Sequence, residues 1–202
     1  MTRKMHKGDI TLEPGSIENE RFLSDEWPSD NGALIDITIV AASWDTPLID
    51  DLKARGPAML DHIAARLSLD PKRVSLLLCN DEDMCAMNKI HRGVDKATNV
   101  LAFPADDDLQ WAGDMPANEV TIGDIAIAAE TVMHESSRMG IAARDHLLHL
   151  FIHGVLHLLG YDHEEDSPAA EMERLEIDLL AQMKIANPYH SDHRVFGMRG
   201  IE

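Results

Sequence analysis

The 202-residue sequence carries 36 acidic and 18 basic side chains, which give a formal net charge of −18 at pH 7. This acidity argues against a general electrostatic grip on nucleic acid, because such binding needs many Lys and Arg contacts to phosphates. It leaves room for a local basic site. Hydrophobic residues make up 45% of the chain, enough to bury a core, so wholesale disorder is excluded.

The sequence also limits the compartment and the partners. No apolar run reaches the roughly 20 residues that a membrane-spanning helix needs. The basic start of the chain is followed by polar and acidic residues where a signal peptide would be apolar. Two cysteines, Cys79 and Cys85, cannot build a disulfide framework. We therefore predict a cytoplasmic protein that binds neither a membrane nor DNA.

The first predicted elements follow a polar segment. Residues 1–31 show no sustained period and are predicted to be a loosely ordered extension. Residues 34–41 alternate β-branched and polar side chains, which favours a strand. A helical region follows Thr46, and Gly56–Pro57 should bend or split it. The next strand is predicted at 73–79.

The second half begins with a helix and ends in a block of helices. A helix over 81–90 precedes strands at 99–104 and 123–128. Three helices follow, at residues 130–139, 142–159 and 168–185. This order predicts an α+β domain over residues 32–186, in which a small mixed sheet of about four strands packs with about five helices. Residues 187–202 are predicted to form a C-terminal tail.

The helix predicted at 142–159 carries the chemistry. His153 and His157 are four residues apart, so a helix places both imidazoles on one face. Gly160 suits the end of that helix, after which the chain can reverse and bring His163 back toward the pair. Three neutral imidazoles with a fourth position open for water are typical of a catalytic zinc site. We predict that His153, His157 and His163 bind one Zn²⁺ ion per chain.

Two other histidines compete for this assignment. His149 also precedes His153 by four residues, but it lies eight residues from His157, about 12 Å along the helix axis. We therefore predict that His149 and His146 support the metal site or pack beside it. The alternative is that all of these histidines are core residues, which would leave many buried imidazole nitrogens in need of partners.

The spacing H-x3-H-x2-G-x2-H coincides with that of the metzincin proteases, which predicts a zincin-like metal-site helix. Gly154 stands where those enzymes carry the glutamate that acts as general base. The protease machinery is therefore incomplete. If the substrate carries a phosphate, a glutamate placed at this position is expected to repel it.

Three motifs together resemble the YbeY family of bacterial endoribonucleases. One is His153-Gly-Val-Leu-His-Leu-Leu-Gly-Tyr-Asp-His163. The second is Met87-Asn-Lys-Ile-His-Arg92-Gly-Val-Asp-Lys-Ala-Thr-Asn-Val-Leu-Ala-Phe-Pro104, and the third is Ile122-Gly-Asp-Ile-Ala-Ile127. Ala102 and Ala97 depart from the serine and proline common in the family.

The resemblance implies a zinc-dependent, single-strand-selective endoribonuclease. It implies roles in rRNA processing (16S rRNA 3′ end maturation) and in ribosome quality control, with single-stranded rRNA as substrate and the ribosome or ribosome-associated proteins as partners. The family's metal ligands fall on His153, His157 and His163, and its functionally important arginine falls on Arg92. Nothing in the resemblance assigns a role to residues 1–31.

Arg92 also has a physical argument. Residues 84–104 contain three bases (Lys89, Arg92 and Lys96) and one acid, a local excess of positive charge in an acidic chain. A guanidinium group can bind two phosphate oxygens at once. The alternative is a surface ion pair. Two other functions stay open: another metallohydrolase such as a peptidase, or a zinc-stabilised ribosome-associated module with little catalysis.

Overall fold

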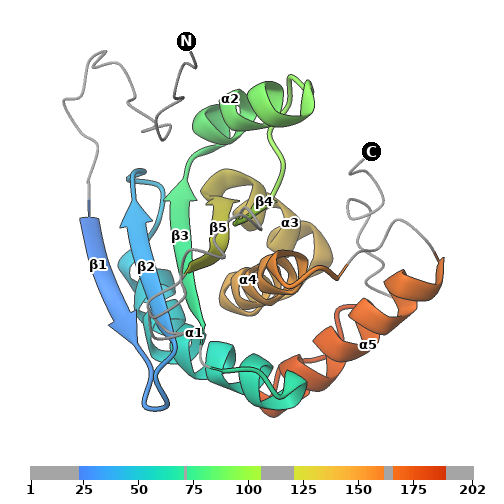
Figure 1. The fold of residues 1–202 in the computed structure, drawn as a ribbon. Helices are drawn as coiled ribbons and strands as arrows, with labels where there is room; N and C mark the ends of the chain where they lie inside the picture. The colour runs from blue at the N-terminus through green and yellow to red at the C-terminus, as the bar shows by residue number, and fades with distance from the viewer. Residues whose placement is uncertain (1–22, 71, 106–120, 162–165, 190–202) are drawn as a thin grey trace, which may run out of the picture.

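The computed structural model describes residues 23–70, 72–105, 121–161 and 166–189, the side chains of 166–168 excepted. These residues form a five-stranded mixed sheet and five helices (Figure 1). The strands are β1 (Leu23–Pro28), β2 (Leu34–Ile39), β3 (Arg73–Cys79), β4 (Val100–Pro104) and β5 (Thr121–Ala128). The helices are α1 (Thr46–Leu67), α2 (Asp81–Arg92), α3 (Ala129–Met139), α4 (Ala143–Leu158) and α5 (Asp166–Gln182). The predicted α+β class is confirmed.

The strand order in the sheet is β1-β2-β3-β5-β4. The three inner strands are parallel to one another, and the edge strands β1 and β4 run antiparallel to their neighbours. Parallel neighbours need a crossover connection, which α1 provides between β2 and β3. At the end of this order, β4 is an edge strand of the sheet.

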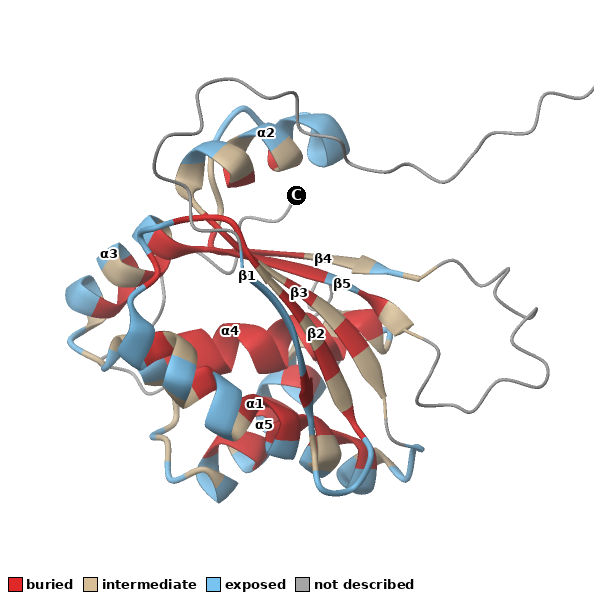
Figure 2. Cartoon of the chain, turned by 90° about the vertical axis from the view of Figure 1, so that its left-hand side faces the viewer, coloured by how far each residue is buried: buried red, intermediate tan, exposed pale blue. Residues whose placement is uncertain are grey.

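The two faces of the sheet have different covers. The main core lies between one face and the helices α1, α3, α4 and α5. On the other face α2 packs its buried Met84 against Cys79, Leu101 and Ala126. Figure 2 shows α2 on one side of the sheet, with α1, α4 and α5 on the opposite side. α4 is the central helix, because twelve of its sixteen residues are buried.

Gly123 brings β4, β5 and the end of α4 close together. It pairs with Pro104 and has a φ of +146°, which residues with a side chain rarely adopt. A Cβ at this position would lie 2.3 Å from the Phe103 carbonyl oxygen and 2.8 Å from Leu158 of α4. The Gly-Asp-Ile motif therefore has a packing role beside the metal-site helix.

The folded domain starts earlier than the sequence predicts. β1 lies within residues 1–31, so the prediction of a loose extension is wrong for residues 23–28. Trp27 is the buried residue of this edge strand and the other five are exposed, so no alternation of apolar residues marks it. Residues 1–22, 106–120 and 190–202 lie outside the described residues.

α1 is one helix, although a proline in a helix interior removes a backbone hydrogen bond. Gly56 and Pro57 are both buried, and a Cβ at Gly56 would lie 3.1 Å from Ile35 of β2. Close packing of α1 against the sheet therefore outweighs the local signal to break. Asp45 caps the helix by accepting a hydrogen bond from the Leu48 N–H.

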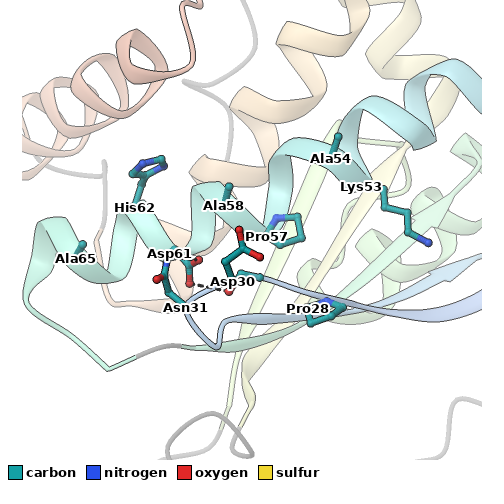
Figure 3. A pocket seen from close by; sticks show the side chains of 11 residues that line it. Pro28, Asp30, Asn31, Lys53, Ala54, Pro57, Ala58, Asp61, His62 and Ala65 are labelled. Atoms are coloured by element: carbon teal, nitrogen blue, oxygen red, sulfur yellow. Dashed lines mark hydrogen bonds between the residues drawn. The ribbon is translucent and has the colours of Figure 1, made fainter.

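A cavity of about 320 Å³ lies between the β1–β2 turn and α1 (Figure 3). The Asp61 carboxylate of α1 holds this turn by accepting hydrogen bonds from Ser29 Oγ at 2.8 Å and Asn31 Nδ2 at 3.1 Å. The residues that line the cavity include none of the predicted site residues. None of the described helices is long and apolar enough to cross a membrane.

Candidate functional site

The metal-site helix ends where the sequence predicts. α4 runs to Leu158, and Gly160 follows with a φ of +86°, a conformation that glycine adopts readily. The Gly160 N–H donates to the His157 carbonyl oxygen at 3.0 Å, and the Tyr161 N–H donates to that of Leu156 at 3.0 Å. These bonds close the helix end and turn the chain away from its axis.

His153 and His157 form a close pair on this helix. Their Nε2 atoms are 3.0 Å apart, and their ring centroids are 4.5 Å apart. The rings of His149 and His153 have the same sequence spacing but lie 6.5 Å apart. His153 is buried and His157 is half-buried, so the pair opens toward the surface at the C-terminal end of α4. Of the two pairs, only His153 and His157 have ring nitrogens close enough together to face the same metal ion.

Glu176 of α5 holds the His153 ring from behind. Its Oε1 lies 2.8 Å from His153 Nδ1, and its side chain is fully buried. Burial would raise the pKa of Glu176, but hydrogen bonds from His149 and His153 outweigh this and hold the pKa well below its ordinary value. An ionised carboxylate only accepts hydrogen bonds, so Nδ1 of His153 carries the proton and Nε2 presents a lone pair.

The second oxygen of Glu176 has two further partners. His149 Nε2 lies 3.2 Å from Oε2, and the Tyr189 hydroxyl donates to the same oxygen. Burial and the Glu176 charge raise the pKa of Tyr189, so this hydroxyl stays protonated and remains a donor. His149 and His153 are therefore linked through the two oxygens of Glu176.

His146 belongs to a parallel arrangement with Glu135 of α3. His146 Nε2 lies 2.8 Å from Glu135 Oε2, which also accepts a hydrogen bond from Asn99 Nδ2 at 3.0 Å. His146 and His149 line a cavity of about 90 Å³. Their Nδ1 atoms are buried and have no hydrogen-bond partner among the described residues.

The third predicted ligand, His163, lies outside the described residues, as do Asp162 and Glu164. Within the described ranges no cluster of three or more His, Cys, Asp or Glu side chains could hold a metal ion. The structure therefore brings together two of the three predicted ligands.

Arg92 belongs to α2, which covers the opposite face of the sheet from α4, the helix of the histidines. It is the last residue of α2, where Gly93 ends the helix with a φ of +73°. Its side chain is exposed, and partial desolvation lowers its pKa. It makes no ion pair within the described part of the chain, whereas the neighbouring Lys89 pairs with Asp95 at 2.6 Å. The predicted alternative of a surface ion pair thus finds no partner there.

β4 connects the two groups of residues. The His91 ring, next to Arg92, lies 4.7 Å from the Phe103 ring of β4. On the opposite face, α4 packs against β4 and β5. His91 of α2 and helix α4 therefore contact the same edge strand, β4, from opposite faces of the sheet.

Gly154, which stands in place of the metzincin glutamate, lies where α4 packs closely on β5. A Cβ at this position would lie 3.0 Å from both Cδ1 and Cγ2 of Ile125, a buried residue of β5. Position 154 therefore faces the sheet, and a side chain there requires Ile125 to shift. The glycine thus lets α4 pack closely on β5.

Sequence reasoning missed Glu176 and Tyr189. A signal for Glu176 was available, because it lies on the apolar stripe of α5 beside Met172, Leu175 and Leu179, all buried. A glutamate on a buried stripe requires donors, which are not visible in the local sequence. Tyr189 lies in the segment predicted as a tail, where no pattern marks it.

The chain is similar to known proteins over most of its length. A family model described as Endoribonuclease YbeY matches residues 44–184. Endoribonuclease YbeY of Bartonella quintana is 40% identical over 158 residues, 77% of this chain and 96% of that protein. The Dinoroseobacter shibae protein of that name is 38% identical over 171 residues, 79% of this chain and 92% of the relative. The Rhodospirillum rubrum protein is 49% identical over 121 residues, 59% of each chain.

Among solved structures, the solution structure of TM1509 from Thermotoga maritima aligns with a TM-score of 0.48 and 22% identity, over 74% of this chain and 91% of that one. The family assignment rests on the sequence matches. The family model covers more than half of the chain, and two relatives at 38% and 40% identity cover more than three quarters of it. The chain therefore belongs to the YbeY family of endoribonucleases.

Proposed function

We propose that this protein is a zinc-dependent endoribonuclease that cuts single-stranded RNA. Following the family resemblance, we place it in the cytoplasm, in 16S rRNA 3′ end maturation and in ribosome quality control. The observation that supports the metal is the pair of Nε2 atoms of His153 and His157, 3.0 Å apart. Because the net charge is −18, we propose that the ribosome or a ribosome-associated protein delivers the RNA.

The described side chains fit zinc chemically. His153 and His157 offer imidazole nitrogens at the four-residue helical spacing common in zinc sites. A carboxylate behind one ligand, as Glu176 lies behind His153, is the usual partner of a zinc-bound histidine. His163 is the proposed third ligand from its place after Gly160. When bound, zinc supplies a Lewis acid that activates water and stabilises negative charge on a phosphate.

The residues of this chain would divide the remaining work. The histidines would hold the metal at the surface end of α4. Arg92 would bind the phosphodiester through its guanidinium fork and stabilise charge that develops on the phosphate oxygens. It has no competing carboxylate among the described residues. In this proposal the RNA runs past β4 from Arg92 to the histidines. Such a path requires an extended strand, which favours single-stranded RNA.

The two alternatives make different demands on the site. A metzincin-like peptidase needs a carboxylate at position 154, where this chain has a glycine and where a side chain would press on Ile125. A ribosome-associated module with little catalysis needs the zinc site but not an accessible arginine. Arg92 is exposed and makes no described ion pair, which favours the nuclease.

One experiment separates these functions. The zinc content of the purified protein is measured, and samples are incubated with unstructured RNA, duplex RNA, single-stranded DNA and a peptide. We expect about one zinc per chain and cleavage of the unstructured RNA only. Chelation should abolish the cleavage and added zinc should restore it, and rising salt should weaken it because few cationic contacts hold the RNA.

Each of the other outcomes would refute a different part of the proposed function. Full activity without metal would refute zinc dependence. Peptide hydrolysis without RNA cleavage would support the peptidase. Bound zinc with no cleavage of any substrate would support the ribosome-associated module.

Replacing Arg92 with alanine is expected to leave zinc content and melting temperature unchanged and to remove most RNA cleavage. One hydrogen-bonded charge contact contributes about 1.5–3 kcal/mol, a factor of roughly 10 to 150 in rate if it acts in the transition state. Arg92→Lys should recover only part of it, since an ammonium lacks the planar fork. Arg66→Ala is the control, because Arg66 is half exposed and pairs with Asp178 at 3.9 Å. Equal cleavage by Arg92→Ala and Arg66→Ala would contradict the proposed phosphate contact.

A further inference from the structure

The fully buried Glu176 raises a question of energy. A carboxylate without exposed surface is strongly destabilising unless donors surround it. Glu176 has three donors: His153 Nδ1 on one oxygen, and His149 Nε2 and the Tyr189 hydroxyl on the other. The pair of contacts on Oε2 fixes the carboxylate plane, so that Oε1 points at His153. This arrangement is more elaborate than packing of α5 against α4 requires.

Glu135 provides an internal comparison. Like Glu176, it is a buried glutamate that binds a buried histidine of α4, here His146 at 2.8 Å. The two pairs differ in what the other imidazole nitrogen meets. The free side of the His146 ring, Nδ1, has no hydrogen-bond partner in the described part of the chain. In His153 the other nitrogen, Nε2, faces His157 Nε2 at 3.0 Å.

We propose that Glu176, held in place by Tyr189 and His149, is a positioning residue that fixes His153 with its Nε2 lone pair turned toward the metal. This inference rests on the proposed zinc site and deepens it, since the histidine motif does not include Glu176. It also gives the segment after α5 a role, because Tyr189 fastens the carboxylate from there. Glu135 and His146 form a purely structural pair of the same chemical type.

The physical consequence is a higher affinity for zinc. An imidazole that donates Nδ1–H to a carboxylate is a more basic ligand and needs no tautomer change to bind metal. Without the carboxylate, the ring can also place its proton on Nε2, which blocks ligation until the proton moves. Loss of such a partner typically lowers metal affinity 10- to 100-fold.

The test compares Glu176→Gln with Glu135→Gln in the full-length protein. Both changes remove one buried charge and keep the side-chain shape, so both are expected to lower the melting temperature. The zinc dissociation constant is measured by competition with a chromogenic chelator. We expect it to rise about 10- to 100-fold in Glu176→Gln and to match wild type in Glu135→Gln.

A second readout needs neither metal nor activity. In the zinc-free protein, imidazole ¹⁵N chemical shifts report which nitrogen of His153 carries the proton, at a pH above the ordinary imidazole pKa. Wild type and Glu135→Gln should show Nδ1–H alone, and Glu176→Gln should show a mixture. If Glu176→Gln fails to fold, Tyr189→Phe keeps the carboxylate and should weaken zinc binding a few-fold.

The outcomes separate this inference from the proposed function. Zinc affinity and tautomer equal to wild type in Glu176→Gln, or in Tyr189→Phe if the former is unfolded, would overturn the positioning role. Equal losses in Glu176→Gln and Glu135→Gln would reduce both glutamates to general stabilisers of the core and would also overturn it. Failure of the wild type to bind zinc would instead refute the proposed function itself.

Discussion

The His157→Ala variant is expected to lose stoichiometric zinc and all measurable RNA cleavage. Groups that only support a metal ligand contribute 10- to 100-fold in affinity, so loss of a ligand itself should exceed about 100-fold. The same variant should lose zinc-dependent stabilisation. At a zinc concentration 100 times the dissociation constant, a protein that binds only in its native state gains about 2.7 kcal/mol.

The measurement is the zinc content and the melting temperature with and without added zinc. His62→Ala is the matched control, because His62 is an exposed histidine of α1, far in sequence from the motif. Zinc should raise the melting temperature of the control as much as that of wild type. A His157→Ala protein that retains one zinc would contradict the 153–157 pair and would make 149–153 the better candidate.

The Gly154→Glu variant is expected to destabilise the fold severely and to gain no peptidase activity. The sequence predicts that the new charge repels the phosphate. The position of Gly154 in the structure predicts a larger effect, the loss of stability. The new side chain would meet Ile125 at 3.0 Å and would carry a charge into the interface of α4 and β5. Overpacking alone destabilises by about 1–3 kcal/mol, and an unpaired buried charge adds several more.

Gly154→Ala isolates the steric part of this effect. Alanine favours a helix over glycine by about 1 kcal/mol, and overpacking costs about 1–3 kcal/mol, so we expect a net loss of up to about 2 kcal/mol. Gly56→Ala is the control, since its Cβ would meet a single terminal methyl group, Ile35 Cδ1, at 3.1 Å and that group can move. Denaturant unfolding measures both. A Gly154→Ala protein as stable as Gly56→Ala would show that Ile125 yields easily and that packing does not explain the glycine.

Local signals predicted α4 and its histidine pair because both features are periodic. Helical spacing places His153 and His157 on one face in any α-helix, and a glycine after the last turn marks the end of α4. Both features depend on a few neighbouring residues. The same reasoning gave the wrong result for α1, where Gly56 and Pro57 signal a break but close packing on the sheet keeps the helix continuous.

The edge strand β1 is an element that local sequence signals failed to predict. Only Trp27 of its six residues is buried, so the strand lacks the alternation by which strands are predicted. It forms because β2 offers it a complete antiparallel ladder, from Leu23 opposite Ile39 to Pro28 opposite Leu34. Backbone pairing of this kind leaves almost no trace in side-chain patterns.

By itself, the sequence determined the fold class, the family and the pair of imidazoles that faces one way on α4, because these follow from local periodicity and motif spacing. Only the tertiary structure decided which histidine pair is closest, which carboxylate lies behind His153 and which residue a side chain at position 154 would meet. Those answers depend on contacts between α4 and elements distant in the chain, Glu176 on α5 and Ile125 on β5. Such contacts arise when helices pack against a sheet, and no short stretch of sequence encodes them.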